Sequence, residues 1–130
     1  MANSSTARCL IVEDDAADRL MFERVFSRSK FPCRADFAET LALARRYLMG
    51  GSYSLIILDN TLRDGNGADF VAELAASERL ASMPVAIISD WPSPFMFAKA
   101  RARNVAAVMT KSEFSAERLE HLLAAVASRD

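Results

Sequence analysis

The sequence predicts an α/β fold in which a parallel sheet is covered by helices on both faces. Short apolar runs of strand length alternate with longer stretches whose apolar residues recur at helical spacing. The run Leu55–Leu58 is apolar throughout, as expected of a central strand that is buried on both faces. That run ends in a single carboxylate, Asp59, at the edge of the sheet where open α/β folds place their chemistry.

The first two βα units occupy the N-terminal part of the chain. A strand is expected at 9–12, followed by a helix over Ala16–Ser29. The second strand, at about 34–38, alternates polar and apolar residues, which is typical of a strand at the edge of a sheet. A helix over Thr40–Met49 follows, and a glycine pair marks its end.

The third and fourth units follow the same pattern. The central strand, at 54–58, precedes a helix over Asn66–Ser77. Pro84 then opens a fourth strand at 85–88, and the next helix is expected over Pro94–Arg103.

The fifth unit ends the predicted domain. Its strand, at 105–109, precedes the most clearly amphipathic stretch of the chain, Ser115–Ser128, for which Ser115 is the expected N-cap. We therefore expect one domain over residues 1–130, with 1–7 as a flexible N-terminal segment.

Composition narrows the classes of function. Sixteen basic and seventeen acidic residues give a net charge of −1, which argues against a chain built to bind nucleic acid through its phosphates. No apolar stretch has the length of a membrane span, so no membrane partner is expected. Cys9 and Cys33 lack the spacing of metal ligands and are interpreted as small core residues, which favours a reducing cytoplasm.

Polar side chains from separate segments should meet at the carboxyl edge of the sheet. They are Asp14 and Asp15 after the first strand, Asp59 after the third, Ser89 after the fourth and Lys111 after the fifth. Crowded carboxylates repel one another and favour Mg²⁺, a hard cation that prefers oxygen ligands. A carboxylate placed like Asp59 can attack a phosphoryl group and form an aspartyl phosphate if the developing charge is stabilised. Mg²⁺, Lys111 and Ser89 would supply that stabilisation.

Four short motifs, in this order, resemble those of the receiver domains of bacterial two-component response regulators. They are the segment from Leu10 to Asp15, Leu58-Asp59 with Asp64-Gly65 downstream, Ile87-Ile88-Ser89, and Thr110-Lys111. The resemblance covers nearly the whole chain and implies a flavodoxin-like (βα)5 three-layer sandwich with strand order 2-1-3-4-5. It also implies a cytoplasmic, stand-alone, CheY-like receiver without an output domain of its own.

The same resemblance implies that Asp59 accepts a phosphoryl group from a histidine kinase or a histidine phosphotransfer protein. Mg²⁺ would be held by Asp15, Asp59 and the backbone carbonyl of Thr61, with Asp14 acting through water or through Lys111. The chain would carry out only its own Mg²⁺-dependent phosphorylation and slow autodephosphorylation, and would otherwise not be an enzyme. Phosphorylation would switch the binding of a partner protein at the fourth helix, fifth strand and fifth helix. The sequence leaves open whether the chain is a monomer or a homodimer.

Three positions depart from the family pattern. Val108 stands three residues before the lysine, where the family usually has an aromatic switch residue. Ser112 replaces the usual proline after the lysine, and Arg63 replaces the proline that is common four residues after the acceptor. The loops around the site are therefore expected to differ from those of typical receivers.

The segment after Ser89 contains Trp91, Phe95 and Phe97 and is unusually apolar for a loop beside such a site. One hypothesis is that Trp91 shields the phosphoryl group from hydrolytic water. A second is that the three aromatic residues carry the change of state that an aromatic residue at Val108 would otherwise carry.

Three rival functions share parts of these motifs. Leu58–Asp64 is similar to a segment of haloacid-dehalogenase-type phosphatases, but Ile57 stands where those enzymes have their nucleophile. A flavodoxin-type FMN carrier needs a phosphate-binding loop after the first strand, where Glu13, Asp14 and Asp15 would repel phosphate. The rival that stays open is a receiver-like interaction module that works without regulated phosphorylation.

Overall fold

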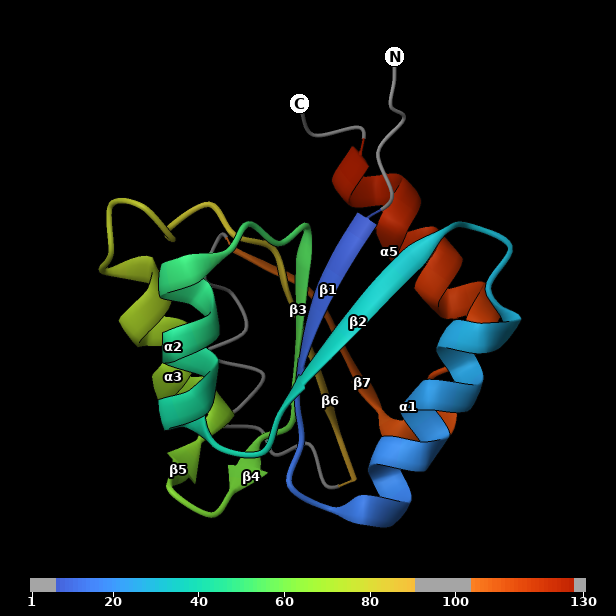
Figure 1. Ribbon diagram of the computed structural model, residues 1–130, viewed down its shortest axis with the longest axis horizontal. Coiled ribbons are helices and arrows are strands. Elements are labelled where there is room, and N and C mark those ends of the chain that lie inside the picture. The colour runs from blue at the N-terminus through green and yellow to red at the C-terminus, as the bar shows by residue number, and fades with distance from the viewer. Residues whose placement is uncertain (1–6, 91–103, 128–130) are drawn as a thin grey trace.

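The computed structural model describes residues 7–90 and 104–127. These residues form a five-stranded parallel sheet with helices on both faces (Figure 1). The strands are β1 (Ala7–Val12), β2 (Cys33–Ala38), β3 (Leu55–Leu58), β6 (Val85–Ser89) and β7 (Val105–Thr110). The helices are α1 (Ala16–Arg28), α2 (Leu41–Gly50), α3 (Gly67–Ala75) and α5 (Ala116–Ala127).

The strands of the sheet lie in the order β2-β1-β3-β6-β7, which confirms the predicted order 2-1-3-4-5. β3 is central and fully buried, and β2 lies at the edge, as their hydrophobicity patterns predicted. The five strands of this sheet and the four described α-helices begin and end within two residues of their predicted ranges. The predicted fourth helix, Pro94–Arg103, lies outside the described residues, as do Trp91, Phe95 and Phe97.

Predictions about the N-terminus, membrane and cysteines have separate outcomes. Ala7, which the sequence placed in a flexible segment, is the first residue of β1, and residues 1–6 lie outside the described part. None of the helices within residues 7–90 and 104–127 combines the length and apolarity that a membrane crossing requires. Both cysteines are free thiols; Cys9 is buried in the core as predicted, whereas Cys33 is only half-buried.

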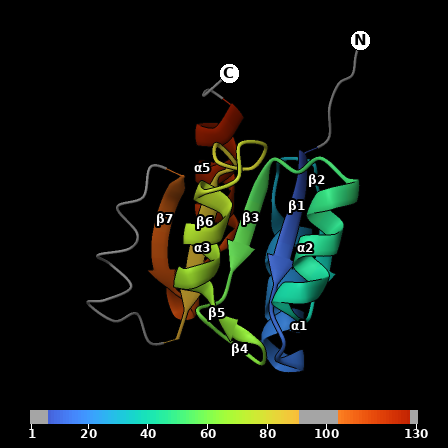
Figure 2. The same cartoon turned by 90° about the vertical axis from the view of Figure 1, so that its left-hand side faces the viewer.

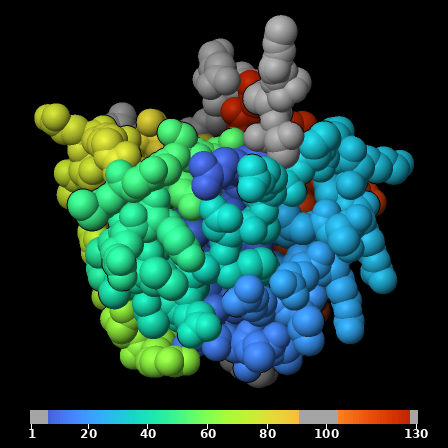
Figure 3. Space-filling model, in the orientation of Figure 1, coloured from blue at the N-terminus to red at the C-terminus, as the bar shows by residue number. Residues whose placement is uncertain are grey.

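Each face of the sheet has its own hydrophobic core. Alternate residues of β1 point to opposite faces, so Leu10 and Val12 pack with α2 and α3, whereas Cys9 and Ile11 pack with α1 and α5. Figure 2 turns α2 and α3 toward the viewer, and Figure 3 shows side chains of α2 and α1 flanking the edge strand β2. Two cores of this kind make the sheet a rigid frame whose strands end at one edge.

Side-chain caps determine where the helices begin at this edge. In each helix the residue before the first turn accepts a hydrogen bond from a backbone amide of that turn. The predicted cap is confirmed in α5, where the Arg118 amide donates to Ser115 Oγ at 3.2 Å. The four capping residues are Asp15, Thr40, Asn66 and Ser115.

A short antiparallel hairpin, β4 (Thr61–Leu62) and β5 (Gly65–Asn66), follows the central strand. The sequence predicted no strand in this region, only a helix that begins at Asn66. Gly65 has a φ of 152°, a conformation that side chains disfavour, and the preceding Asp64 reaches across to α2. The Asp64 carboxylate accepts hydrogen bonds from the amides of Leu41 and Ala42 at 2.9 and 3.0 Å. This second cap ties the loop after β3 to the start of α2.

Candidate functional site

Asp59 lies directly after β3, at the carboxyl edge of the sheet. Its backbone N–H donates to the Val12 carbonyl at 3.2 Å, so the pairing of β1 with β3 continues one residue beyond the strand. Gly67 packs so closely behind it that a Cβ at this position would lie 2.5 Å from the Asp59 carbonyl oxygen. Asp59 is 7% exposed. The carboxylate is therefore held by rigid backbone and is largely removed from solvent.

Glu13 and Asp14 bring two further carboxylates to Asp59. One carboxylate oxygen from each of the three residues lies within 4.8 Å of the other two. The register of β1 and β3 explains Glu13, because it places this residue level with Asp59 just beyond the last strand pair. Asp14 is oriented by Arg63, whose backbone N–H donates to Asp14 Oδ2 at 3.1 Å.

The prediction that Asp15 binds Mg²⁺ at this edge requires correction. Asp15 is exposed and caps α1, where its Oδ2 accepts a hydrogen bond from the Asp18 amide at 2.9 Å. A capping side chain turns toward the free amides of its own helix, so this carboxylate does not join the cluster. The acidic pair that meets Asp59 is Glu13 and Asp14, one residue earlier than the sequence indicated.

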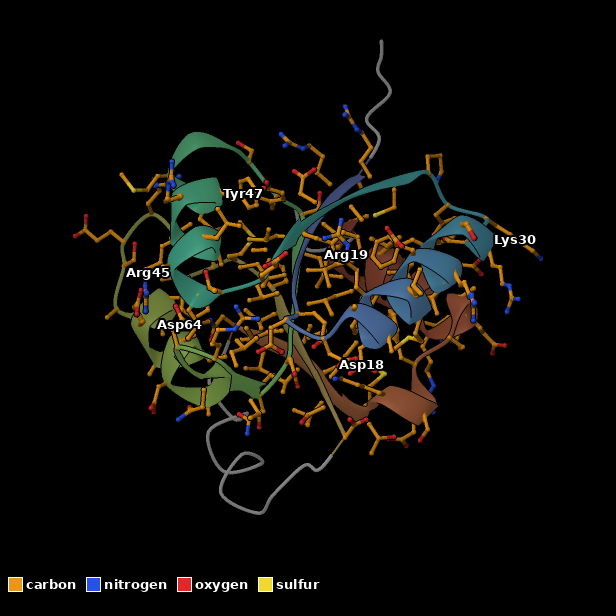
Figure 4. All side chains as sticks on the ribbon, turned by 60° about the horizontal axis from the view of Figure 1, so that its bottom comes forward. Asp18, Arg19, Lys30, Arg45, Tyr47 and Asp64 are labelled. Carbon is orange, nitrogen blue, oxygen red and sulfur yellow. The ribbon has the colours of Figure 1, made fainter. Side chains whose placement is uncertain are left out.

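Lys111 contacts carboxylates from four segments of the chain. Its Nζ lies 2.5 Å from Asp18 Oδ2 and 2.9 Å from Glu13 Oε1. The same atom lies 3.5 Å from Asp59 Oδ2 and 3.9 Å from Asp90 Oδ2. Figure 4, which brings this edge forward, labels Asp18 at the start of α1. The structure thus brings Lys111 to Asp59, as predicted, but places its shortest contact on a residue that the sequence analysis missed.

Two signals could have identified the missed residues. Glu13 directly follows the apolar run of β1, as Asp59 directly follows that of β3. Asp18 lies in the first turn of α1, and a helix that starts at this edge presents its first turn to the site. Neither signal predicts which residue the Glu13 or Asp18 side chain contacts.

Ser89 and Thr61 lie near the same edge. Ser89 is the last residue of β6 and is 4% exposed. Because β6 lies between β3 and β7, Ser89 stands between the strand ends that lead to Asp59 and Lys111. Thr61 begins β4, two residues after Asp59, so its backbone is close in sequence to the cluster.

Burial and charge act in opposite directions on these groups. Burial raises the pKa of the Glu13 carboxyl to about 7, although the contact with Lys111 opposes the change. Burial also raises the pKa of Asp59, against the effects of Lys111 and of the Asn60 and Thr61 amides. For Lys111, burial lowers the pKa, but the carboxylates of Asp18 and Glu13 outweigh it and raise the pKa overall. Lys111 therefore stays protonated, and the carboxylates of Asp18, Glu13 and Asp59 share its single positive charge.

The cluster fits a hard divalent cation. Three carboxylate oxygens at mutual distances within 4.8 Å form a donor set of the kind that Mg²⁺ and Mn²⁺ prefer. Glu13 Oε1 is buried and accepts no hydrogen bond of good geometry; the Lys111 ammonium compensates its charge from 2.9 Å. Negative charge thus remains in excess around Asp59 among the described residues, which favours a bound cation.

The positions that depart from the receiver pattern lie close to this site. Val108 is half-buried in β7 and packs against the core that contains α2 and α3. Ser112 lies in the 3-10 helix η1 (Lys111–Glu113), and its Oγ is 3.0 Å from Thr110 Oγ1. Arg63 is exposed in the hairpin, where its amide contacts Asp14. His121 is exposed on α5.

Comparison with known proteins identifies the family of this chain. Residues 9–124 match the family model described as the response regulator receiver domain. A curated relative, the "Probable methanogenesis regulatory protein FilR2" of Methanothrix harundinacea, is 29% identical over 108 residues, which cover 78% of this chain and 70% of the relative.

Solved structures share the fold at lower identity. The phosphorylated cyanobacterial phytochrome response regulator RcpA is 22% identical, with a TM-score of 0.75 over 95% of this chain and 91% of its own. The Mn²⁺-bound form of response regulator Rcp1 is also 22% identical, with a TM-score of 0.73 over 94% and 90% of the two chains. At this low sequence identity, the similarity to these two structures shows a shared fold and nothing further.

Proposed function

The chain belongs to the response regulator receiver domain family, and from this membership we propose that Asp59 is its phosphoryl acceptor. Receiver domains act in phosphorylation-based signalling and interact with histidine kinases and downstream targets. The proposed donor is a histidine kinase or a histidine phosphotransfer protein. The observation that carries the proposal is the Lys111 ammonium, 3.5 Å from the buried carboxylate of Asp59.

In the proposed reaction, an oxygen of the Asp59 carboxylate attacks the phosphorus atom of the donor. A new O–P bond forms, the P–N bond to the donor imidazole breaks, and the imidazole leaves with the bond electrons. Burial of Asp59 weakens hydration of the carboxylate, and the raised pKa of Lys111 keeps a positive charge beside the transferring group. The Ser89 hydroxyl would donate a hydrogen bond to a phosphoryl oxygen.

A divalent cation completes the proposed site. When bound, Mg²⁺ supplies positive charge that neutralises the carboxylates and the phosphoryl oxygens. Glu13, Asp14 and Asp59 would hold it, with the backbone carbonyl of Thr61 as a further ligand. The Mn²⁺ recorded for Rcp1 supports a divalent cation in a related protein.

We propose that phosphorylation then changes the affinity of this chain for a partner protein. The surface assigned to the partner comprises residues 94–103, which lie outside the described part of the structure, together with β7 and α5. Val108, which is half-buried in β7 three residues before Lys111, belongs to that surface. In the rival proposal, an interaction module without regulated phosphorylation, the chain binds its partner without phosphorylation of Asp59.

Intact mass spectrometry separates the two proposals. The native chain is incubated with acetyl phosphate and Mg²⁺, and one phosphoryl adduct is expected. The near-isosteric variant Asp59→Asn and a sample with EDTA should give no adduct, since one lacks the nucleophile and the other the cation. No adduct on the native chain under any of these conditions favours the interaction module.

A further inference from the structure

The contacts of Lys111 are unevenly shared between its partners. Its Nζ is 2.5 Å from Asp18 and 2.9 Å from Glu13, but 3.5 Å from Asp59. Lys111 is 8% exposed, so its ammonium group relies on these carboxylates rather than on water. The Lys111 ammonium, which the proposed reaction needs beside Asp59, therefore makes its shortest contact with Asp18.

The position of Asp18 in α1 favours its contact with the Lys111 ammonium. It lies in the first turn of α1, and its amide is fixed by the hydrogen bond to the capping Asp15. The helix already has a cap, so the Asp18 carboxylate is not needed for capping and is turned to Lys111, 93 positions along the chain. Its side chain is 28% exposed, which leaves room for it to move into water if it loses the lysine.

We propose that Asp18 is a positioning residue that holds Lys111 in a resting state and releases it when Asp59 becomes phosphorylated. This inference rests on the proposed function of Asp59. Phosphorylation replaces the single negative charge of the Asp59 carboxylate with the roughly 1.5 to 2 negative charges of the phosphoryl group, which shifts the competition for the Lys111 ammonium away from Asp18. Before transfer, Asp18 slows the reaction, because Lys111 must leave it in order to stabilise the transferring group. After transfer, the first turn of α1 loses its contact with Lys111, so the change of state reaches α1.

Kinetics of adduct formation test the first half of the proposal. With saturating Mg²⁺ and acetyl phosphate, Asp18→Asn is expected to form the Asp59 adduct about twofold to fivefold faster than the native chain, the range for loss of a partly exposed ion pair. Asp18→Glu restores the negative charge and should return the rate toward the native value. The matched control is Asp69→Asn, since Asp69 occupies the same place in α3 relative to its cap Asn66 and should leave the rate unchanged.

The NMR signal of the Lys111 ammonium group provides a readout that helix stability alone would not move. We expect this signal to shift in unphosphorylated Asp18→Asn but not in Asp69→Asn, and to shift in the native chain on phosphorylation. This inference is overturned if Asp18→Asn forms the adduct at or below the native rate, or if the Lys111 signal does not change. In that case the proposed function stays intact as long as the native chain forms the adduct at Asp59. If the native chain forms no adduct at Asp59, the proposed function fails and this inference fails with it.

Discussion

The two ends of the sheet treat their charged residues in opposite ways. At the amino end, Arg8 pairs with Asp36 at 3.0 Å, and the Tyr53 hydroxyl donates to the same carboxylate at 2.7 Å. At the carboxyl end, Lys111 faces carboxylates from four segments, and Glu13 and Asp14 crowd around Asp59. One cluster is balanced and partly exposed; the other is unbalanced and buried.

The pKa values follow this difference. The hydrogen bond from Tyr53 and the charge of Arg8 lower the pKa of Asp36, so its ionised form is stabilised by folding. Burial raises the pKa of Asp59 and Glu13, so their ionised forms are destabilised by folding. A protein keeps such an unfavourable cluster where a ligand or a reaction can relieve it, which is a mark of functional sites.

The largest effect should follow removal of the lysine from the crowded end. Lys111→Met keeps the length of the side chain but leaves the carboxylates without its charge. We expect the rate of phosphoryl adduct formation from acetyl phosphate to fall by at least about a hundredfold, the usual cost of losing a group that stabilises developing charge. Intact mass over time measures this rate. Lys30→Met, at an exposed lysine in the loop after α1, is the control, and a rate close to native in Lys111→Met would contradict the assigned role.

The next effect concerns the pH dependence of stability without a divalent cation. The pKa of Glu13 is about 7 in the folded chain, against an ordinary value of 4.5, so between these values the folded state binds more protons than the unfolded state. Stability from this group is therefore fully present below pH 4.5 and is lost as the pH rises through 7. We expect the free energy of unfolding to fall by up to about 3 kcal/mol across this interval.

Urea denaturation in EDTA at a series of pH values measures this slope. Glu13→Gln should remove most of it, because glutamine resembles the protonated acid at every pH. Addition of Mg²⁺ to the native chain should restore stability at the upper end of the interval, since the cation compensates the ionised carboxylates. A slope that survives in Glu13→Gln would assign the effect to another group.

The smallest effect should come from the balanced end. Asp36→Asn removes a carboxylate whose side chain is 38% exposed, so we expect a loss of no more than about 1 kcal/mol in the free energy of unfolding at neutral pH. The sign of the pH dependence is opposite to that of Glu13, because the stabilising effect of a lowered pKa is lost as the pH falls toward and below 3.8. Thermal unfolding of the native chain, Asp36→Asn and Glu13→Gln at pH 3, pH 5 and pH 7 compares the two ends directly. Equal pH dependence at both ends would show that the contrast between them is wrong.

Local patterns were sufficient for most of the fold. The apolar runs identify β1, β3 and β6 because a strand buried on both faces needs apolar side chains at every position. Alternation in β2 identifies the edge, and helical spacing identifies α5, since each depends on neighbours within the same segment. The β4–β5 hairpin was not predicted, because its strands contain only two residues each and carry no periodic signal.

The sequence by itself determined that Asp59, Ser89 and Lys111 follow successive strands and so reach one edge of the sheet. Only the tertiary structure decided which acidic residues join them. The register of β1 against β3 places Glu13 beside Asp59, and the Arg63 amide orients Asp14. The start of α1 uses Asp15 as its cap and turns Asp18 toward Lys111. These choices depend on how separate elements are aligned and rotated, and adjacent carboxylates in one short segment are indistinguishable until that packing is in place.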